Sequence, residues 1–168
     1  MAEKRSAQKT FINTAKGGGS SSYALIGDGV TELSISYNAQ SSTNQYIHED
    51  TATTTVTGYQ PNAPVTSEVV KGDPAFEFIN AMRRDLPVGS DAETDIVTVD
   101  LFDGTGDSYP AIKQKVSVQI DSYGGPASDP LSIGYTLNWI GAGESGTFNP
   151  TTKTFTPGGA SGASEVEV

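Results

Sequence analysis

Apolar and polar residues alternate along several stretches of the chain, the pattern of β-strands that turn one face toward a core. In 30–37 the apolar side chains alternate with Glu and Ser, directly after an Asp28-Gly29 turn signal that suits a hairpin. The same alternation recurs in 112–120 and 131–139, which a Gly- and Pro-rich segment separates. We therefore predict that these two stretches pair as a long antiparallel hairpin.

Three further stretches indicate strands, although their patterns are weaker. The stretch 95–102 is more apolar, which is typical of a strand buried on both faces. The stretch 51–57 is rich in threonine but lacks an apolar face, and 147–155 suggests a short final strand. The intervening segment 38–50 is polar, and it is interpreted as a long connection.

A helix is predicted over residues 74–86. Asp73 can cap it, Pro74 suits its first position, and Pro87 ends it. An apolar stripe recurs at helical spacing, formed by Phe76, Ile79, Met82 and Leu86. We expect this stripe to cover the chain's own sheet, with docking of a neighbouring chain as the alternative.

These elements predict a mostly β fold, a β-sandwich or barrel with one flanking α-helix. Residues 1–22 are interpreted as a flexible basic N-terminal arm, 23–156 as the folded domain, and 157–168 as a flexible tail. The chain has more half-polar strands and polar connections than its apolar residues can cover. Either a closed monomeric barrel or sheet pairing between identical subunits would accommodate such strands.

The formal net charge is −10, and the basic residues near the N-terminus leave the rest of the chain more acidic still. Such a surface repels a nucleic-acid backbone, so specific nucleic-acid binding is not expected. The absence of cysteine excludes disulfides and thiolate metal ligands. No apolar run predicts a membrane span or a secretory signal, so we expect synthesis in the cytoplasm.

Candidate chemistry is sparse. His48 is the lone histidine, and no G-x-S-x-G elbow accompanies it, so neither a catalytic triad nor a zinc site is predicted. The G-x-G-x-x-G match at 141–146 lacks the helix that a dinucleotide site requires. The loop 103–107 has two carboxylates but not the later glutamate of a calcium loop. We expect no cofactor.

Asp91, Glu93 and Asp95 would share one face of an extended segment, where paired carboxylates could serve glycoside hydrolysis. No aromatic sugar platform flanks them, so an acidic face that is solvated or salt-bridged is the preferred interpretation. Arg83 and Arg84 could pair with these acids in the same subunit or the next one. They also complement the helix dipole. The chain is therefore predicted not to be an enzyme.

Several sequence blocks occur in a characteristic order. They are VKGDP at 70–74, RR at 83–84, VGSDAETD at 88–95, the run from YPA at 109–111 to ID at 120–121, and the run from GTF at 146–148 to KTF at 153–155. In their order and spacing they resemble the major tail tube proteins of long-tailed (siphovirus-type) bacteriophages. The N-terminal 22 residues carry no part of this resemblance.

The resemblance implies a virion protein that forms hexameric rings, with long hairpins joined into an inter-subunit β-barrel. Stacked rings would form a tail tube through which genomic DNA passes without specific binding. Its partners would be further copies of itself and other tail proteins, such as the tape measure, distal tail and terminator proteins. No membrane partner is expected.

Polar strand faces are the candidates for the tube lumen, in two groups of paired strands. The lumen candidates are Glu32, Ser34 and Ser36 with Thr53 and Thr55, and Ser117, Gln119 and Asp121 with Ser132, Thr136 and Asn138. The segment 38–50 is either a ring-to-ring contact or a free loop before assembly. The candidates for contacts between rings or subunits are Tyr46, His48, Glu49, Asp50, Arg83, Arg84, Asp91 and Glu93.

A different class of function is a monomeric β-sandwich module for carbohydrate binding or adhesion on a phage particle. Such modules present clustered exposed aromatic residues. Trp139, the one tryptophan, lies on the apolar face of its predicted strand. This placement favours assembly over carbohydrate binding.

Overall fold

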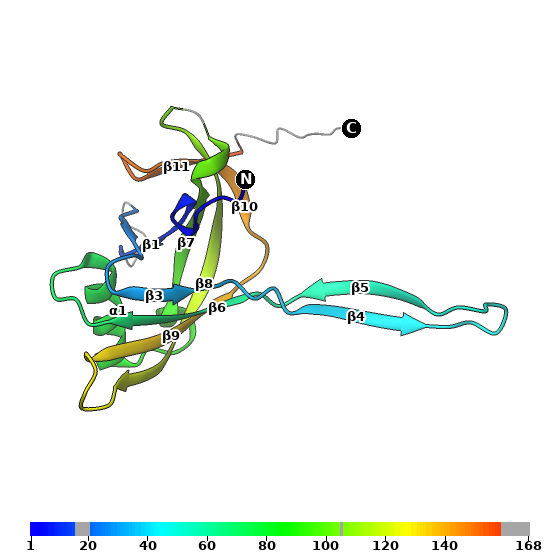
Figure 1. Ribbon diagram of the computed structural model, residues 1–168, viewed down its shortest axis with the longest axis horizontal. Coiled ribbons are helices and arrows are strands. Elements are labelled where there is room, and N and C mark those ends of the chain that lie inside the picture. Colours follow the sequence, from blue (N-terminus) through cyan, green and yellow to red (C-terminus); the bar gives the residue numbers. More distant parts are fainter. Residues whose placement is uncertain (16–20, 105, 159–168) are drawn as a thin grey trace.

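The computed structural model describes residues 1–15, 21–104 and 106–158, which form one α-helix, short 3-10 turns and β-strands (Figure 1). The predicted mostly β fold with a flanking helix is confirmed. The helix is α1 (Pro74–Asp85). The strands are β1 (Gln8–Asn13), β2 (Tyr23–Leu25), β3 (Val30–Leu33), β4 (Ala39–Asn44), β5 (Thr53–Tyr59), β6 (Asn62–Glu68), β7 (Glu93–Asp100), β8 (Tyr109–Gly124), β9 (Ser132–Trp139), β10 (Glu144–Asn149) and β11 (Thr154–Pro157).

The main sheet runs in the order β2-β1-β7-β8-β9-β6-β3, and β10 joins it through β8 and carries β11. β2 and β3 stand at opposite ends of this order, yet only residues 26–29 separate them along the chain. The sheet must therefore curl back on itself. Arg5 Nη2 donates to the carbonyl oxygen of Leu33 at 3.0 Å and so links the N-terminal segment to β3.

The turn at Asp28-Gly29 forms as predicted, with Gly29 at φ 78°, but it does not make a hairpin. β2 pairs with β1, whereas β3 pairs with β6. The turn signal was correct locally, but the pairing of its flanking strands depends on residues far away in the sequence.

β8 is the longest strand and organises the sheet. β7 pairs with one stretch of it, β10 pairs with its first residues, and β9 pairs with its second half. The predicted antiparallel pairing of 112–120 with 131–139 is confirmed, with Val116 opposite Trp139. The strand predicted at 95–102 is confirmed for 95–100, which belong to β7 and include the fully buried Ile96 and Val97. It is wrong for Leu101 and Phe102, which form a 3-10 turn.

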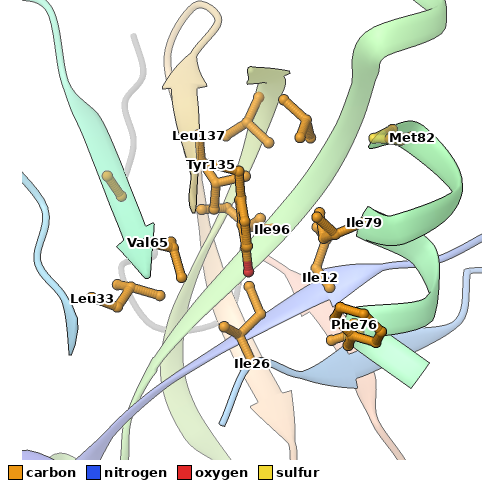
Figure 2. Packing of buried hydrophobic residues seen from close by; sticks show 14 of the residues in the cluster. Ile12, Ile26, Leu33, Val65, Phe76, Ile79, Met82, Ile96, Tyr135 and Leu137 are labelled. Atoms are coloured by element: carbon orange, nitrogen blue, oxygen red, sulfur yellow. The ribbon is translucent and has the colours of Figure 1, made fainter. Parts of the chain in front are cut away.

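The helix α1 forms where the sequence predicts it. The Asp73 side chain accepts a hydrogen bond from the Phe76 backbone N–H at 3.2 Å, and Pro74 takes the first helical position. Phe76, Ile79 and Met82 are buried against the sheet (Figure 2). The predicted stripe therefore covers the chain's own core, except at Leu86, which is exposed.

Two hydrophobic clusters fill the body. The larger combines α1 with one sheet face, and Figure 2 shows Ile79 and Phe76 of the helix beside Ile12 of β1. The smaller cluster surrounds the fully buried Phe148, whose ring centroid lies 4.7 Å from that of Phe11. Neighbouring residues of β1 thus enter different clusters, because successive side chains of a strand point to opposite faces.

The prediction of a flexible arm over residues 1–22 is wrong for residues 8–13. These form β1, an interior strand between β2 and β7, and Ile12 is completely buried. A strand with only two large apolar residues, each on a different face, shows no period along the sequence. Residues 16–20 of this arm lie outside the described residues, as does the predicted tail 157–168 apart from Pro157 and Gly158.

β4 and β5 form a separate two-stranded hairpin that projects from the body along the longest axis of the molecule (Figure 1). The interpretation of 38–50 as a connection is therefore wrong for 39–44, which is strand. The single strand predicted over 147–155 is two strands, β10 and β11, which pair with each other. No helix in the described part of the chain is both long and apolar enough to cross a membrane.

Candidate assembly surfaces

One face of the main sheet is polar across five neighbouring segments of chain. The strand register places Ser36 opposite Asn62, Asn62 opposite Asn138, Asn138 opposite Ser117, and Ser117 opposite Glu93. A row of polar side chains therefore crosses the sheet, on the side opposite the helix. We call this side of β3, β6, β9, β8 and the start of β7 the polar face.

Hydrogen bonds tie the polar face together where β8 meets β9. Asp121 lies in a β-bulge, and its carboxylate accepts from Thr136 Oγ1 and from Gln119 Nε2, each at 2.6 Å. Asn138 Nδ2 donates to Gln119 Oε1 at 3.3 Å. The Ser132 hydroxyl donates to the carbonyl oxygen of Gly124 at 3.1 Å. The structure thus brings together the lumen candidates that the sequence placed on these two strands.

β6 lies between β9 and β3 in the polar face, although its sequence does not predict a strand. Ala63, Val65 and Ser67 are buried, whereas Pro64 and Thr66 between them are exposed. The period of two is present, but it is carried by small residues and interrupted by a proline. A count of large apolar residues misses such a strand.

The partner predicted for β3 is also wrong. Glu32 lies opposite Thr66 of β6 on the polar face, not beside Thr53 and Thr55. Ser34 follows β3 as an exposed residue. Thr53 and Thr55 instead pair with residues of β4, in the projecting hairpin. They therefore lie away from the other nine lumen candidates.

Charges on the polar face are mainly acidic, although the alternation along β8 places Lys113 and Lys115 on this side as well. Lys115 Nζ lies 2.9 Å from Glu93 Oε1, and the register places Lys115 opposite Asp95. The hydrogen bond to Glu93 and the charge of Asp95 raise the pKa of Lys115. Glu93 therefore has a partner within its own chain. Asp91 lies in the short 3-10 turn before β7 and is exposed.

The β4–β5 hairpin has the opposite character, because its strands cover no core. All six residues of β4 are exposed, and so are the large side chains Val56 and Tyr59 of β5. The Thr43 and Thr54 hydroxyls form a cross-strand hydrogen bond of 2.8 Å. A two-stranded hairpin of this kind is marginally stable on its own in water.

The tip of the hairpin is an ordered turn that presents apolar and acidic side chains. Glu49 Oε2 accepts from the Tyr46 backbone N–H at 3.2 Å, and the rings of Tyr46 and His48 stack at 6.2 Å. Ile47 is fully exposed, and Asp50 is exposed as well. His48 thus belongs to an exposed turn, where Glu49 lies 4.0 Å away.

At the end of α1, Arg83 and Arg84 differ in their surroundings. Arg83 donates from Nε to Asn80 Oδ1 at 2.9 Å, and its guanidinium carbon lies 3.9 Å from the centroid of the Tyr123 ring. Arg84 is exposed to solvent. The described residues show no ion pair that joins either arginine to Asp91 or Glu93.

Two acidic groups of the body, the Tyr135 hydroxyl and the Asp100 carboxyl, have raised pKa values. Burial, together with the charge of Asp73, raises the pKa of Tyr135 in the core. Burial and the charge of Asp103 raise the pKa of Asp100. Among the residues that the structure describes, no group of three His, Cys, Asp or Glu side chains is placed to hold a metal ion.

The solved structures that match this chain include one from the tail of an empty GTA particle, computed with helical refinement and C6 symmetry. The match has a TM-score of 0.60 at 14% sequence identity, and it covers 84% of this chain and 97% of the other. The two chains share a fold. No protein-family model matches the sequence, and no curated protein matches it.

Proposed function

We propose that this protein is a structural tail protein of a phage-like particle, which assembles as hexameric rings that stack into a tube. The shared fold with a chain of a C6-symmetric tail carries the proposal. The order of the sequence blocks at 70–155 supports the same family, independently of overall identity. The tail location would make this a virion component, synthesised in the host cytoplasm.

The division of the surface supports a tube subunit. The curved sheet packs one face against α1, and its other face is polar. When sheets from neighbouring copies join, the polar face can remain in contact with water. In a closed ring, such faces would line a wet channel while the apolar faces stay within each subunit. The lumen assignment therefore favours the candidates on β3, β8 and β9, and it adds Thr66 and Glu68 of β6.

Acidic side chains give that channel a role in DNA passage. Glu32, Glu68 and Asp121 carry negative charge on or beside the polar face, and Lys115 is paired with Glu93. Phosphates would be repelled from such a wall, so DNA would move through without sticking. The protein would act as a conduit and not as an enzyme, with the tape measure, distal tail and terminator proteins as its other partners.

The hairpin supports the stacking of rings. The exposed side chains of Val56, Tyr59 and Ile47 can be buried only by contact with another molecule. The hairpin is also long enough to reach beyond its own subunit (Figure 1). We therefore assign the contact between rings to the β4–β5 hairpin. The hairpin includes Thr53 and Thr55, so we no longer assign these two residues to the lumen.

Negative-stain electron microscopy of the purified full chain over a concentration series tests the proposal. We expect rings with six-fold symmetry and tubes built from them. A carbohydrate-binding or adhesion module would remain a compact monomer at every concentration. That outcome, confirmed by analytical ultracentrifugation, would overturn the proposed function.

A further inference from the structure

Leu86 is an unusual residue for its position. It ends α1 in the left-handed conformation, at φ 48°, where glycine or asparagine is preferred. A leucine in this conformation is strained, because its Cβ lies too close to the following carbonyl oxygen. Its side chain is 65% exposed, so burial within its own chain does not offset that strain.

Other exposed apolar side chains lie at the same end of the molecule. Val88 is 81% exposed two residues beyond Leu86, and Tyr123 near the end of β8 is 43% exposed. The contact between Arg83 and the Tyr123 ring joins the helix end to this strand end. Arg84 adds an exposed cation, whereas Arg83 is only partly exposed. We call Arg83, Arg84, Leu86, Val88 and Tyr123 the α1-end patch.

The hairpin tip matches the α1-end patch in chemistry. Tyr46 and Ile47 offer exposed apolar surface, and Glu49 and Asp50 supply two negative charges. The patch offers apolar surface with two arginines. Asp85 lies beside these arginines and lowers the positive charge of the patch without cancelling it.

The two surfaces also lie at opposite ends of the molecule. Figure 1 shows the hairpin tip at one end of the longest axis, with α1 and the β8–β9 turn at the other. A contact between two different surfaces is heterologous, and when it runs end to end it produces an open stack instead of a closed pair. A single tip would bury little area, but six such contacts between two rings would act together.

We infer that the α1-end patch is the docking site for the β4–β5 hairpin tip of a second copy of this chain. The inference rests on the proposed function and specifies the surface that receives the hairpin. The apolar contact covers Ile47, Leu86 and Val88. Arg83 and Arg84 face the acidic side chains of the tip, which fixes the direction of stacking.

Cysteine crosslinking tests the inference directly, because the natural chain contains no cysteine. The double variant Ile47→Cys with Val88→Cys, treated with a short bismaleimide, is expected to give a ladder of linked chains on denaturing gels. The matched control joins Ile47→Cys with Asp107→Cys, an exposed position in the loop before β8, and should give no ladder. Either single variant should give no ladder.

Charge reversal gives a second readout that does not need cysteine. Asp50→Arg or Arg84→Glu alone should lower the sedimenting, assembled fraction at least about tenfold, and the two together should restore most of it. Both positions are exposed, so folding should be unaffected.

The outcomes separate the inference from the proposed function. The wild-type chain could form tubes while the double cysteine variant gives no ladder and the charge swap gives no rescue. That result would overturn the docking site but not the proposed tube. A wild-type chain that forms no rings or tubes would overturn both. A ladder, or rescue by the charge swap, would support the docking site.

Discussion

The body of the protein and the β4–β5 hairpin are both built from antiparallel strands, yet they differ in what covers their side chains. In the body, Ile12, Val116 and Phe148 are completely buried between the sheet and the elements folded onto it. In the hairpin, every residue of β4 is exposed. The body can therefore fold alone, whereas the hairpin is held mainly by its own backbone pairing and gains side-chain cover only from a partner.

Removing the hairpin should produce the largest effect on assembly with little effect on folding. Replacement of residues 40–58 by a short Gly-Ser turn connects strands that are already adjacent, since Ala39 lies opposite Tyr59. We expect loss of tubes in electron micrographs and a melting temperature close to that of the full chain. A large fall in melting temperature would contradict the independence of the body.

The same comparison can be made with single side chains. Ile12→Ala should lower the free energy of unfolding by about 2–5 kcal/mol, because it leaves a cavity at a completely buried site. The matched change Val56→Ala in the hairpin should cost no more than about 0.5 kcal/mol. Chemical denaturation measures both. Similar losses at the two positions would contradict the contrast between body and hairpin.

A smaller effect is expected on the polar face, which is neither core nor hairpin. Thr136→Ala removes the hydrogen bond to Asp121 and should cost about 1 kcal/mol. Thr66→Ala, on the exposed side of the neighbouring strand, is the control and should change stability by less than about 0.5 kcal/mol. Equal effects would show that the Asp121 network contributes nothing to stability.

The smallest effect concerns Asp100, whose pKa is raised by burial and by the charge of Asp103. The folded state holds this proton more tightly than the unfolded state, so ionised Asp100 costs stability at neutral pH. That cost falls once the pH drops below the folded pKa, and it is gone below the unfolded pKa. Asp100→Asn should therefore raise the melting temperature slightly at pH 7 and not in acid. A lower melting temperature at pH 7 would contradict this assignment.

Features with a strong local signal could be predicted from the sequence. The helix was predictable because Asp73, Pro74 and the apolar stripe all agree, and the β8–β9 hairpin because large apolar residues alternate on both strands. The polar side chains of β8 and β9 followed from the same alternation. Their placement on one face of the sheet could therefore be predicted as well.

Other features have no such signal. β1 places Phe11 and Ile12 in different clusters, and β6 buries small residues around a proline, so neither shows an amphipathic pattern of large side chains. β4 reads AQSSTN and buries nothing, so its strand nature depends on pairing with β5. Strand partners depend on distant residues, which explains the wrong partner assigned to β3.

Hydrogen exchange of backbone amides, compared between dilute chains and assembled material, tests the central contrast most directly. We expect β1, β7 and β8 to be equally protected in both states, and β4 and β5 to exchange rapidly when dilute and at least about tenfold more slowly once assembled. Equal protection of the hairpin in the two states, whether fast or slow, would contradict the claim that a neighbouring copy supplies its cover.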